Sequence, residues 1–508
     1  MRQIIVLLMF LLNQVAWTDS LFQYYPKATE IPLSSQSIPE YLSSHNIIKN
    51  DVPTLTHLSA SFMGWHQQQT TTRHGWSPLH IAIQANDFEY VKNLFHEQPE
   101  LIEQRLSSGH TPFLLAVDLN KTDIVQWMLQ ATNINKEASL HHQHQAIHLA
   151  AQNNNTEIIN LLYNLDPNVV HQALPGGYTP LLIAAASDSL EAFELLFKLS
   201  QSNQMLNLGH HALHIAAYYG NNDIIDFLIN NNEYVDQMNG YDETALHIAA
   251  KNNQRQTVKT LIQYGANLNA KNTHKATPLH LAIQEGNLSI VSLLLKHRPE
   301  LLSDSMMLGN QPIHVATYFN HPKIIDYLLQ LDPLQKHVLN HEQKRPIHIA
   351  TEQGHADSFK LLYHHNERYQ KLPSGHNLLH LAALNGKTNI IKLLLKDQQQ
   401  DLIHETLPQG QTALILAAYH GHYFTTQALL FYGSYSNAVM YNGRSAMHYA
   451  GINNHHDIVE LLTKNNGQAN IYDLDGHSPL SLSSEYKTKF SLGYNLLKRQ
   501  IKHYFYED

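Results

Sequence analysis

Apolar residues recur along most of the chain in pairs of short runs with helical spacing. In the stretch from Thr277 to Leu295 the first run is Leu279, Ala282 and Ile283, and the second is Ile290, Val291, Leu294 and Leu295. Each run forms one stripe on a helix of fewer than ten residues. Such short helices are marginal in water. Their apolar faces therefore need a cover from elsewhere in the chain.

Helix boundaries in this stretch are marked by residues with a clear local preference. Thr277 can cap a helix that Pro278 opens, because proline at the first helical position costs no hydrogen bond. Gly286 can adopt the left-handed conformation that ends a helix, and Asn287 continues the turn. The sequence thus predicts a helix, a tight turn and a second helix.

The same unit recurs along the chain in steps of 32 to 35 residues. Its start, aligned on Thr277, falls at Ser77, Thr111, Gln145, Thr179, His211, Thr244, Thr277, Gln311, Arg345, Asn377, Thr412, Ser445 and, degenerately, Ser478. A period in this range is the signature of a solenoid, in which neighbouring repeats cover each other's apolar faces.

Two positions of the unit keep their residue type through twelve repeats. Five residues after the start lies an alanine, which lets neighbouring helices approach closely: Ala82, Ala116, Ala150, Ala184, Ala216, Ala249, Ala282, Ala316, Ala350, Ala382, Ala417 and Ala450. Nine residues after the start lies Gly, Asn or Asp, the types that tolerate a positive φ: Asn86, Asn120, Asn154, Asp188, Gly220, Asn253, Gly286, Asn320, Gly354, Gly386, Gly421 and Asn454.

This period, with the Thr-Pro-Leu-His-x-Ala signature of residues 277–282, resembles the ankyrin repeat, and the resemblance covers roughly residues 71–497. It implies an all-α ankyrin-repeat solenoid with projecting β-hairpin fingers, one of them after Tyr264 and Gly265. We expect one elongated repeat array over residues 71–485, since each repeat of a solenoid contacts only its neighbours.

The two ends of the chain depart from the repeat. Residues 1–20 combine a basic start at Arg2 with an apolar run over residues 4–12, which is typical of a signal peptide. The alternatives are an uncleaved N-terminal anchor formed by residues 1–17 and a buried helix. Residues 21–70, with scattered Pro and Ser, predict an irregular N-terminal cap.

At the other end, residues 486–508 predict a C-terminal capping helix. Its apolar stripe steps by three or four residues through Phe490, Tyr494, Leu497, Ile501 and Phe505. A helix that binds a membrane surface or a partner is the alternative.

Composition and charge exclude several functions. The net charge of −9 without a block of like charge gives no indication of nucleic-acid binding, and the absence of cysteine excludes disulfides and thiolate sites. Gly386-Lys387-Thr388 lacks the earlier glycine of a phosphate loop, and His404-Glu405 lacks the second histidine of a zinc protease motif. We expect neither an enzyme nor a cofactor.

Histidine is abundant, with 37 residues in the chain. The resemblance implies that those at the signature position are structural, hydrogen-bonding the backbone between repeats: His80, His148, His214, His247, His280, His314, His348, His380 and His448. The clusters at residues 141–144, 364–365 and 455–456 point apart and predict solvated surface rather than a zinc site. Protonating every histidine would move the formal charge from −9 to +28, so acid should destabilise the array.

Partner-binding residues are predicted from the positions that ankyrin proteins use, namely the finger tips and the first-helix residues just before the turn, on the concave face. Here the latter are aromatic in three repeats: Tyr218, Tyr219, Tyr318, Phe319, Tyr419 and His420. Four further aromatic residues fall at or near predicted finger tips: Trp76, Tyr178, Tyr241 and Tyr441. Exposed aromatics are favoured interface anchors. The alternative is that they pack on the neighbouring repeat.

Taken together, the sequence predicts a monomeric scaffold that binds another protein and performs no chemistry. With its export signal it resembles the ankyrin effectors that bacteria living inside host cells deliver to host proteins, which implies a secreted or exported protein. A membrane-anchored ankyrin adaptor is the first alternative, and a histidine-rich protein that responds to pH or binds metal is the second.

Overall fold

The fold was analysed in a computed structural model that describes residues 76–131, 145–174, 176–200, 209–364, 370–396 and 400–483. The chain divides into two compact units, Met1–Tyr241 and Asp242–Asp508, and each is described by itself. The predicted signal segment, the N-terminal cap and the C-terminal capping helix lie outside the described residues. Within these ranges no helix has the length and apolar character needed to traverse a lipid bilayer.

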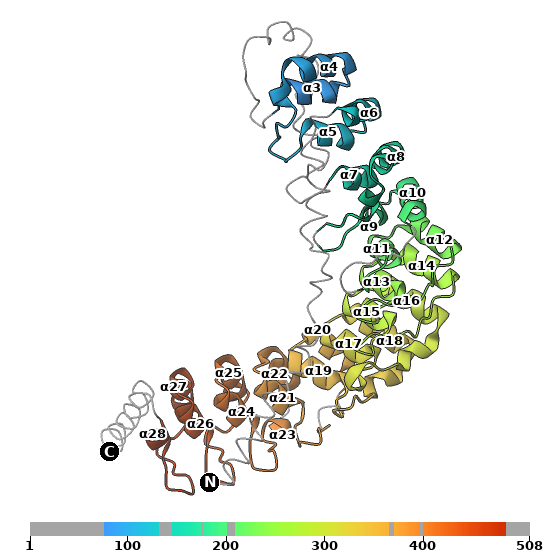
Figure 1. Cartoon of the computed structure of the whole chain (residues 1–508). Coiled ribbons are helices and arrows are strands. Elements are labelled where there is room, and N and C mark those ends of the chain that lie inside the picture. Colours follow the sequence, from blue (N-terminus) through green and yellow to red (C-terminus); the bar gives the residue numbers. More distant parts are fainter. Residues whose placement is uncertain are drawn as a thin grey trace, which may run out of the picture. The chain divides into compact units, whose positions relative to one another are not determined.

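The first unit consists of five helix pairs in its described part (Figure 1). Within this unit, each first helix contacts its own second helix, and each of the first four contacts the first helix of the next pair. The pairs are α3 (Pro78–Ala85) with α4 (Phe88–Glu97), α5 (Pro112–Asp118) with α6 (Thr122–Gln130), α7 (Ala146–Gln152) with α8 (Thr156–Leu165), α9 (Pro180–Ala186) with α10 (Leu190–Ser200), and α11 (Ala212–Tyr219) with α12 (Asn222–Asn230).

The second unit continues the pattern, with one row of first helices and one row of second helices (Figure 1). Its pairs are α13 (Ala245–Lys251) with α14 (Arg255–Gln263), α15 (Pro278–Gln284) with α16 (Leu288–His297), α17 (Pro312–Tyr318) with α18 (Pro322–Leu331), α19 (Pro346–Gln353) with α20 (Ala356–Leu362), α21 (Leu378–Leu384) with α22 (Thr388–Leu395), α24 (Ala413–Tyr419) with α25 (Tyr423–Phe431), and α26 (Ala446–Ile452) with α27 (His456–Lys464). The short α23 (Gln400–Ile403) and α28 (Pro479–Leu482) complete it.

The predicted helix starts are confirmed. All thirteen start residues have extended backbone and directly precede the first residue of a helix. At the degenerate last unit, Ser481 replaces the signature histidine, and its Oγ accepts the N–H of Ser478 at 2.9 Å. A hydroxyl thus fills the place of the imidazole in that cap.

The two invariant positions are confirmed as well. The twelve alanines are at most 1% exposed and lie where adjacent first helices meet. The twelve Gly, Asn or Asp residues have φ between 55° and 86°. Since a left-handed residue is costly for most side chains, this position restricts the residue types and fixes the turn between the two helices of each pair.

Proline follows several second helices and opens a short 3₁₀ helix after each. These are η3 (Pro99–Leu101), η4 (Pro167–His171), η6 (Pro299–Ser303) and η8 (Pro333–His337). A further 3₁₀ turn, η7, spans Met307–Gly309.

The predicted β-hairpin fingers need correction, because the described residues contain no strand. Isolated antiparallel bridges join Thr406 with Thr412 and Val439 with Ser445. In the loop after α14, the Asn272 carboxamide accepts the N–H groups of His274 and Ala276 at 3.0 and 2.9 Å. The side chain thereby closes the loop into a tight turn. The backbone hydrogen bonds that cross this turn are too few for the two strands of a β-hairpin.

Candidate functional site

The aromatic residues predicted at the ends of three first helices lie in contacting pairs. Their ring centroids are 4.9 Å apart for Tyr218 and Tyr219, 5.1 Å for Tyr318 and Phe319, and 4.8 Å for Tyr419 and His420, each edge to face. All six side chains are half-buried. Each pair thus presents a rigid aromatic surface of which part faces solvent.

The backbone under two of these pairs is held by the following repeat. His355 donates from Nε2 to the carbonyl of Tyr318 at 2.9 Å. His455 donates from Nε2 to the carbonyl of Tyr419 at 3.2 Å, and Asn453 donates to the same oxygen at 2.6 Å. These bonds fix the aromatic residues before any partner arrives, which lowers the entropic cost of binding.

The alternative hypothesis, that the aromatic residues pack on the neighbouring repeat, holds in part for Tyr419. Its ring meets that of Tyr449 on the next first helix at 5.4 Å, and His420 stacks on His422 at 5.9 Å. Tyr449 is 9% exposed. The pair of Tyr419 and His420 therefore combines support from the neighbour with a solvent-facing part.

The four finger residues differ in exposure. Tyr241 and Tyr441 are 40% and 76% exposed, whereas Trp76 is half-buried with its ring 6.2 Å from that of His80. Tyr178 is only 3% exposed, so its prediction as an accessible finger residue is wrong. Burial, with Tyr219 and Tyr218 nearby, raises the pKa of its phenol. Its burial depends on the following repeat, which the local sequence does not show.

All nine signature histidines cap their own helices, and five of them also act as struts between repeats, as the resemblance implies. In all nine, Nδ1 accepts the N–H of the residue that precedes the helix, at 3.0 to 3.5 Å. In five of them Nε2 donates, at 3.1 or 3.2 Å, to a carbonyl in the loop leading to the next repeat: His148 to Gln172, His247 to Ala276, His314 to Lys344, His380 to Glu405 and His448 to His477.

This geometry requires a neutral imidazole, because Nδ1 must keep its lone pair to accept a backbone proton. Burial lowers the pKa of seven of these histidines accordingly, His448 among them. The pKa falls to about 4 for His80, His247, His314, His348 and His380 and to about 3 for His280.

A second set of histidines, which the sequence did not identify, joins repeats in the opposite direction; one of them, His455, was wrongly predicted as solvated surface. We call His321, His355, His422 and His455 the turn histidines; each follows the left-handed turn residue. Their Nε2 atoms donate to a carbonyl of the preceding repeat at 2.9 to 3.2 Å. Their fixed position, ten residues after the repeat start, is the signal that could have identified them.

Glycine in the preceding repeat makes room for three of these rings. A Cβ at Gly286, Gly386 or Gly421 would lie 2.7 to 2.8 Å from the ring of His321, His422 or His455. Glycine is favoured at these three positions for two reasons: the backbone has a positive φ, and a larger residue would collide with the histidine ring of the next repeat.

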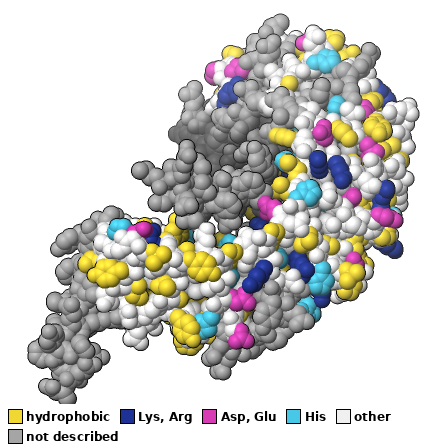
Figure 2. Space-filling view, turned by 90° about the horizontal axis from the view of Figure 1, so that it is seen from below, with side chains coloured by type: hydrophobic (Ala, Val, Ile, Leu, Met, Phe, Trp, Pro, Cys, Tyr) yellow, Lys and Arg dark blue, Asp and Glu magenta, His cyan; other side chains and the backbone are white. Residues whose placement is uncertain are grey.

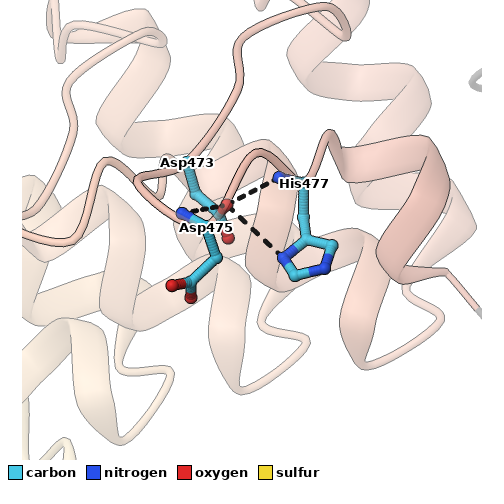
Figure 3. A group of neighbouring side chains, drawn as sticks. All are labelled: Asp473, Asp475 and His477. Carbon is cyan, nitrogen blue, oxygen red and sulfur yellow. Dashed lines mark hydrogen bonds and ion pairs between the residues drawn. The ribbon is translucent and has the colours of Figure 1, made fainter.

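One group of side chains has the composition of a metal site. Asp473, Asp475 and His477 each offer a ligand atom within 4.8 Å of the others (Figure 3). Yet Oδ1 of Asp473 accepts the N–H groups of Asp475 and His477 at 3.0 and 2.7 Å, and Oδ2 accepts Nε of Arg444 at 2.9 Å. The only buried carboxylate of the three is thus occupied by its own loop and by a cation. The arrangement is a loop closure like that at Asn272.

The electrostatics of Asp473 agree with this assignment. Burial alone would raise the pKa of its carboxyl group, but the hydrogen bonds from His477 and Arg444 outweigh burial and leave the pKa lowered. Asp473 is therefore an ionised partner of Arg444.

Ser108, His110 and Asp118 have the order of a nucleophile, a base and an acid. Ser108 Oγ lies 2.8 Å from His110 Nδ1, and His110 Nε2 lies 3.2 Å from Asp118 Oδ2. The same serine–histidine contact, at 2.8 Å, recurs between Ser374 and His376 in a corresponding loop. The contact is thus a recurring feature of the Ser-Gly-His turn, and we assign it a structural role.

Charged side chains of both signs are interspersed on the face that Figure 2 shows, among hydrophobic and uncharged polar ones. No extended area of one sign is present among the described residues in that view. The candidate site is therefore the set of aromatic pairs and exposed finger residues, which can bind by apolar contact and hydrogen bonding.

Comparisons with known proteins found the same repeat along most of the chain. The family described as "Ankyrin repeats (3 copies)" matches residues 45–139, 114–207, 147–239, 181–272, 213–304, 246–340, 300–372 and 347–440. The family described as "Ankyrin repeat" matches residues 442–484.

Individual relatives are similar over part of the chain. Ankyrin repeat protein nuc-2 of Neurospora crassa is 27% identical over 30% of this chain and 18% of its own length. Probable E3 ubiquitin-protein ligase XBOS32 of Oryza sativa subsp. japonica is 30% identical over 22% and 23%, and E3 ubiquitin-protein ligase XBAT33 of Arabidopsis thaliana is 34% identical over 16% and 16%. The chain thus spans less than a quarter of the length of these relatives.

Among solved structures, the ankyrin repeat domain of Bcl-3, a member of the IkappaB protein family, is 23% identical with a TM-score of 0.37. The match covers 43% of this chain and 98% of that domain.

Proposed function

The chain belongs to the ankyrin-repeat family, and we propose that it is a monomeric scaffold that binds another protein through the aromatic pairs of its first helices and its exposed finger residues. Ankyrin repeats are in general protein–protein interaction modules. The single observation that carries the proposal is that two adjacent positions before the turn hold contacting, partly exposed aromatic rings in three repeats. Such rings are the residues that most often dominate binding energy in interfaces.

An experiment on the second unit tests this proposal. A partner is captured with the full chain, purified and titrated by calorimetry against variants. We expect Tyr318→Ala and Tyr419→Ala each to weaken binding at least about 10-fold, because truncating a hot-spot residue costs about 2 kcal/mol or more. The thermal midpoint should fall only slightly for Tyr318→Ala and further for Tyr419→Ala, whose ring also packs on Tyr449.

The matched control is Gln284→Ala with Glu285→Ala, which alters the same two positions in a repeat where they are polar. It should leave affinity unchanged. Equal affinities for the wild type, the aromatic variants and the control would reject these pairs as the binding surface.

Delivery outside the producing cell is part of the proposal. The basic start and apolar run of residues 1–20 support a secreted or exported protein, and an effector that binds a host protein is the role we propose. Intact-mass measurement of the chain recovered from an expressing cell tests this. Loss of about 16 to 20 N-terminal residues is expected for a cleaved signal. Retention of residues 1–17 would favour the membrane-anchored adaptor.

The similarity to two ubiquitin ligases does not extend the proposal to catalysis. It covers 23% and 16% of those proteins, so their activity is not carried to this chain.

A further inference from the structure

The second helices carry a feature that separates one repeat from all others. We number positions from the repeat start, and consider positions 12 and 19, which lie on the solvent side of each second helix. Eleven of twelve repeats have a polar or charged residue at both. At position 12 these are Glu89, Asp123, Glu157, Glu191, Asp223, Gln256, Ser289, Lys323, Asp357, Asn389 and Asp457, and at position 19 His96, Gln130, Asn164, Lys198, Asn230, Gln263, Lys296, Gln330, His364, Lys396 and Lys464.

The exception is α25, which has phenylalanine at both positions. Phe424 and Phe431 are 71% and 82% exposed. Residues seven apart share a helix face and lie about 10 Å apart along the axis. The core of this repeat does not use them, because α25 buries Thr425, Thr426, Ala428 and Leu429 instead. Two exposed phenylalanines thus lie on one helix face, with the exposed Gln427 between them, and we call this face the α25 strip.

Positive charges flank one end of the α25 strip. Helix α25 packs between α22 and α27, and position 19 of these neighbours is Lys396 and Lys464, both exposed. Lys392 adds a third exposed cation on α22, while on α27 Asp457 lies at the other end and Glu460 lies one turn before Lys464. The surroundings of Phe431 therefore carry three lysines against one glutamate.

This charge pattern decides between occupants. A second copy running parallel, with Phe431 on Phe431, would place Lys396 opposite Lys464. An antiparallel copy, with Phe431 on Phe424, would pair Lys464 with Asp457 but leave Lys396 opposite the uncharged Asn389. A partner with acidic side chains beside an apolar face would pair with Lys396 and Lys464 while covering the strip. Apolar residues at spacings of three, four and seven on a helix match a strip of this length.

We propose that the α25 strip is a docking site for an acidic amphipathic helix of another protein. The apolar face of that helix covers Phe424 and Phe431, and acidic residues on both flanks of one end pair with Lys396 and Lys464. The site lies on the second helices, so it is separate from the aromatic pairs, and its failure would leave the proposed function above untouched.

The test uses two synthetic fluorescent peptides with one shared leucine stripe at i, i+3, i+4 and i+7. One carries glutamate on both flanks of the stripe and the other carries lysine. Fluorescence anisotropy with the full chain should show binding of the glutamate peptide at least about 10-fold tighter than that of the lysine peptide.

Variants then assign the binding to the strip. Phe424→Asp with Phe431→Lys gives α25 the residue types of its neighbours and should fold normally, yet it should lower affinity for the glutamate peptide at least about 10-fold. Lys396→Glu with Lys464→Glu should invert the preference between the peptides. The control Leu331→Gln, which removes a 50% exposed apolar residue from α18, should change neither.

Three outcomes would overturn the proposal. They are equal affinity for the two peptides, unchanged affinity in the double phenylalanine variant, and a wild-type dimer seen by light scattering that this variant abolishes. The last outcome would assign the strip to a second copy of the chain.

Discussion

At the scale of single residues, one signature histidine makes two structural hydrogen bonds, one that caps its own helix and one that binds the next repeat. In the repeat of Thr244, one nitrogen of His247 accepts the N–H of Thr244 and the other donates to the carbonyl of Ala276 at 3.1 Å. The ring thus caps its own helix and attaches the next repeat. The bond from Thr244 exists only while the imidazole is neutral, since protonation of Nδ1 would remove the acceptor, whereas Nε2–H donates to Ala276 in either state.

Acid should therefore weaken the array. The folded pKa of the signature histidines, about 3 to 4, lies below the unfolded value of about 6.5, so the unfolded chain binds more protons between these limits. Stability is complete above pH 6.5 and falls as the pH drops toward 4, by about 2 kcal/mol per histidine at pH 5. Urea unfolding at pH 7.5 and pH 5 checks this, and equal midpoints would contradict it.

The substitution His247→Leu distinguishes the contribution of His247 to acid sensitivity from that of all other titrating groups. Leucine occupies this position naturally at Leu114 and Leu182, so the variant should fold. At pH 7.5 it should lose about 1 to 3 kcal/mol, because the buried N–H of Thr244 and carbonyl of Ala276 lose their partner. At pH 5 the difference from the wild type should shrink, since leucine cannot take up a proton. A constant difference at both pH values would argue against neutral His247 as the titrating strut.

At the scale of elements, the helix starts and turns could be predicted because each depends on residues close in sequence. Thr277 with Pro278 marks a start, and Gly286 marks a turn, whatever lies beside them. The fingers could not be predicted in the same way. Asn272 takes up backbone donors with its side chain and leaves a turn where a hairpin was expected.

The candidate site was predictable only in part, for the same reason. The paired rings of Tyr318 and Phe319 follow from adjacent positions at a helix end. The burial of Tyr178 and the carbonyl contact of His321 arise between repeats, so they depend on which side chains the neighbour brings. A periodic pattern shows that repeats stack but not which individual contacts form.

The contact between Gly286 and His321 predicts an effect of Gly286→Ala that a suitable control can isolate. Gly286 and Gly265 have φ of +79° and +81°, so alanine costs about 1 to 2 kcal/mol at either from backbone strain. A Cβ at Gly286 also lies 2.8 Å from the ring of His321, whereas nothing lies within 4 Å at Gly265. Gly286→Ala should thus destabilise more than Gly265→Ala in parallel chemical denaturation. Equal losses would mean that His321 moves aside without cost.

At the scale of the whole molecule, the repeat architecture limits how far a local defect spreads. Within the second unit, α19 contacts α17 and α21 among the first helices, and none further along the row. Stability of such an array is close to a sum of repeat terms and nearest-neighbour terms. In such an array one interface between repeats can be disrupted while distant repeats stay folded, including those that carry an aromatic pair or the α25 strip.

The substitution Ala350→Leu tests this locality. Ala350 is 0% exposed where α19 meets its neighbours, so a larger side chain should cost about 1 to 3 kcal/mol through overpacking. Native-state hydrogen exchange should accelerate in α17, α19 and α21 and stay unchanged in α26, because the interfaces of α26 are intact. Ala450→Leu, the equivalent change in α26, should give the reverse pattern. If either variant accelerated exchange evenly through residues 242–483, the second unit would unfold as one cooperative body, and binding at each surface would then depend on every repeat in it.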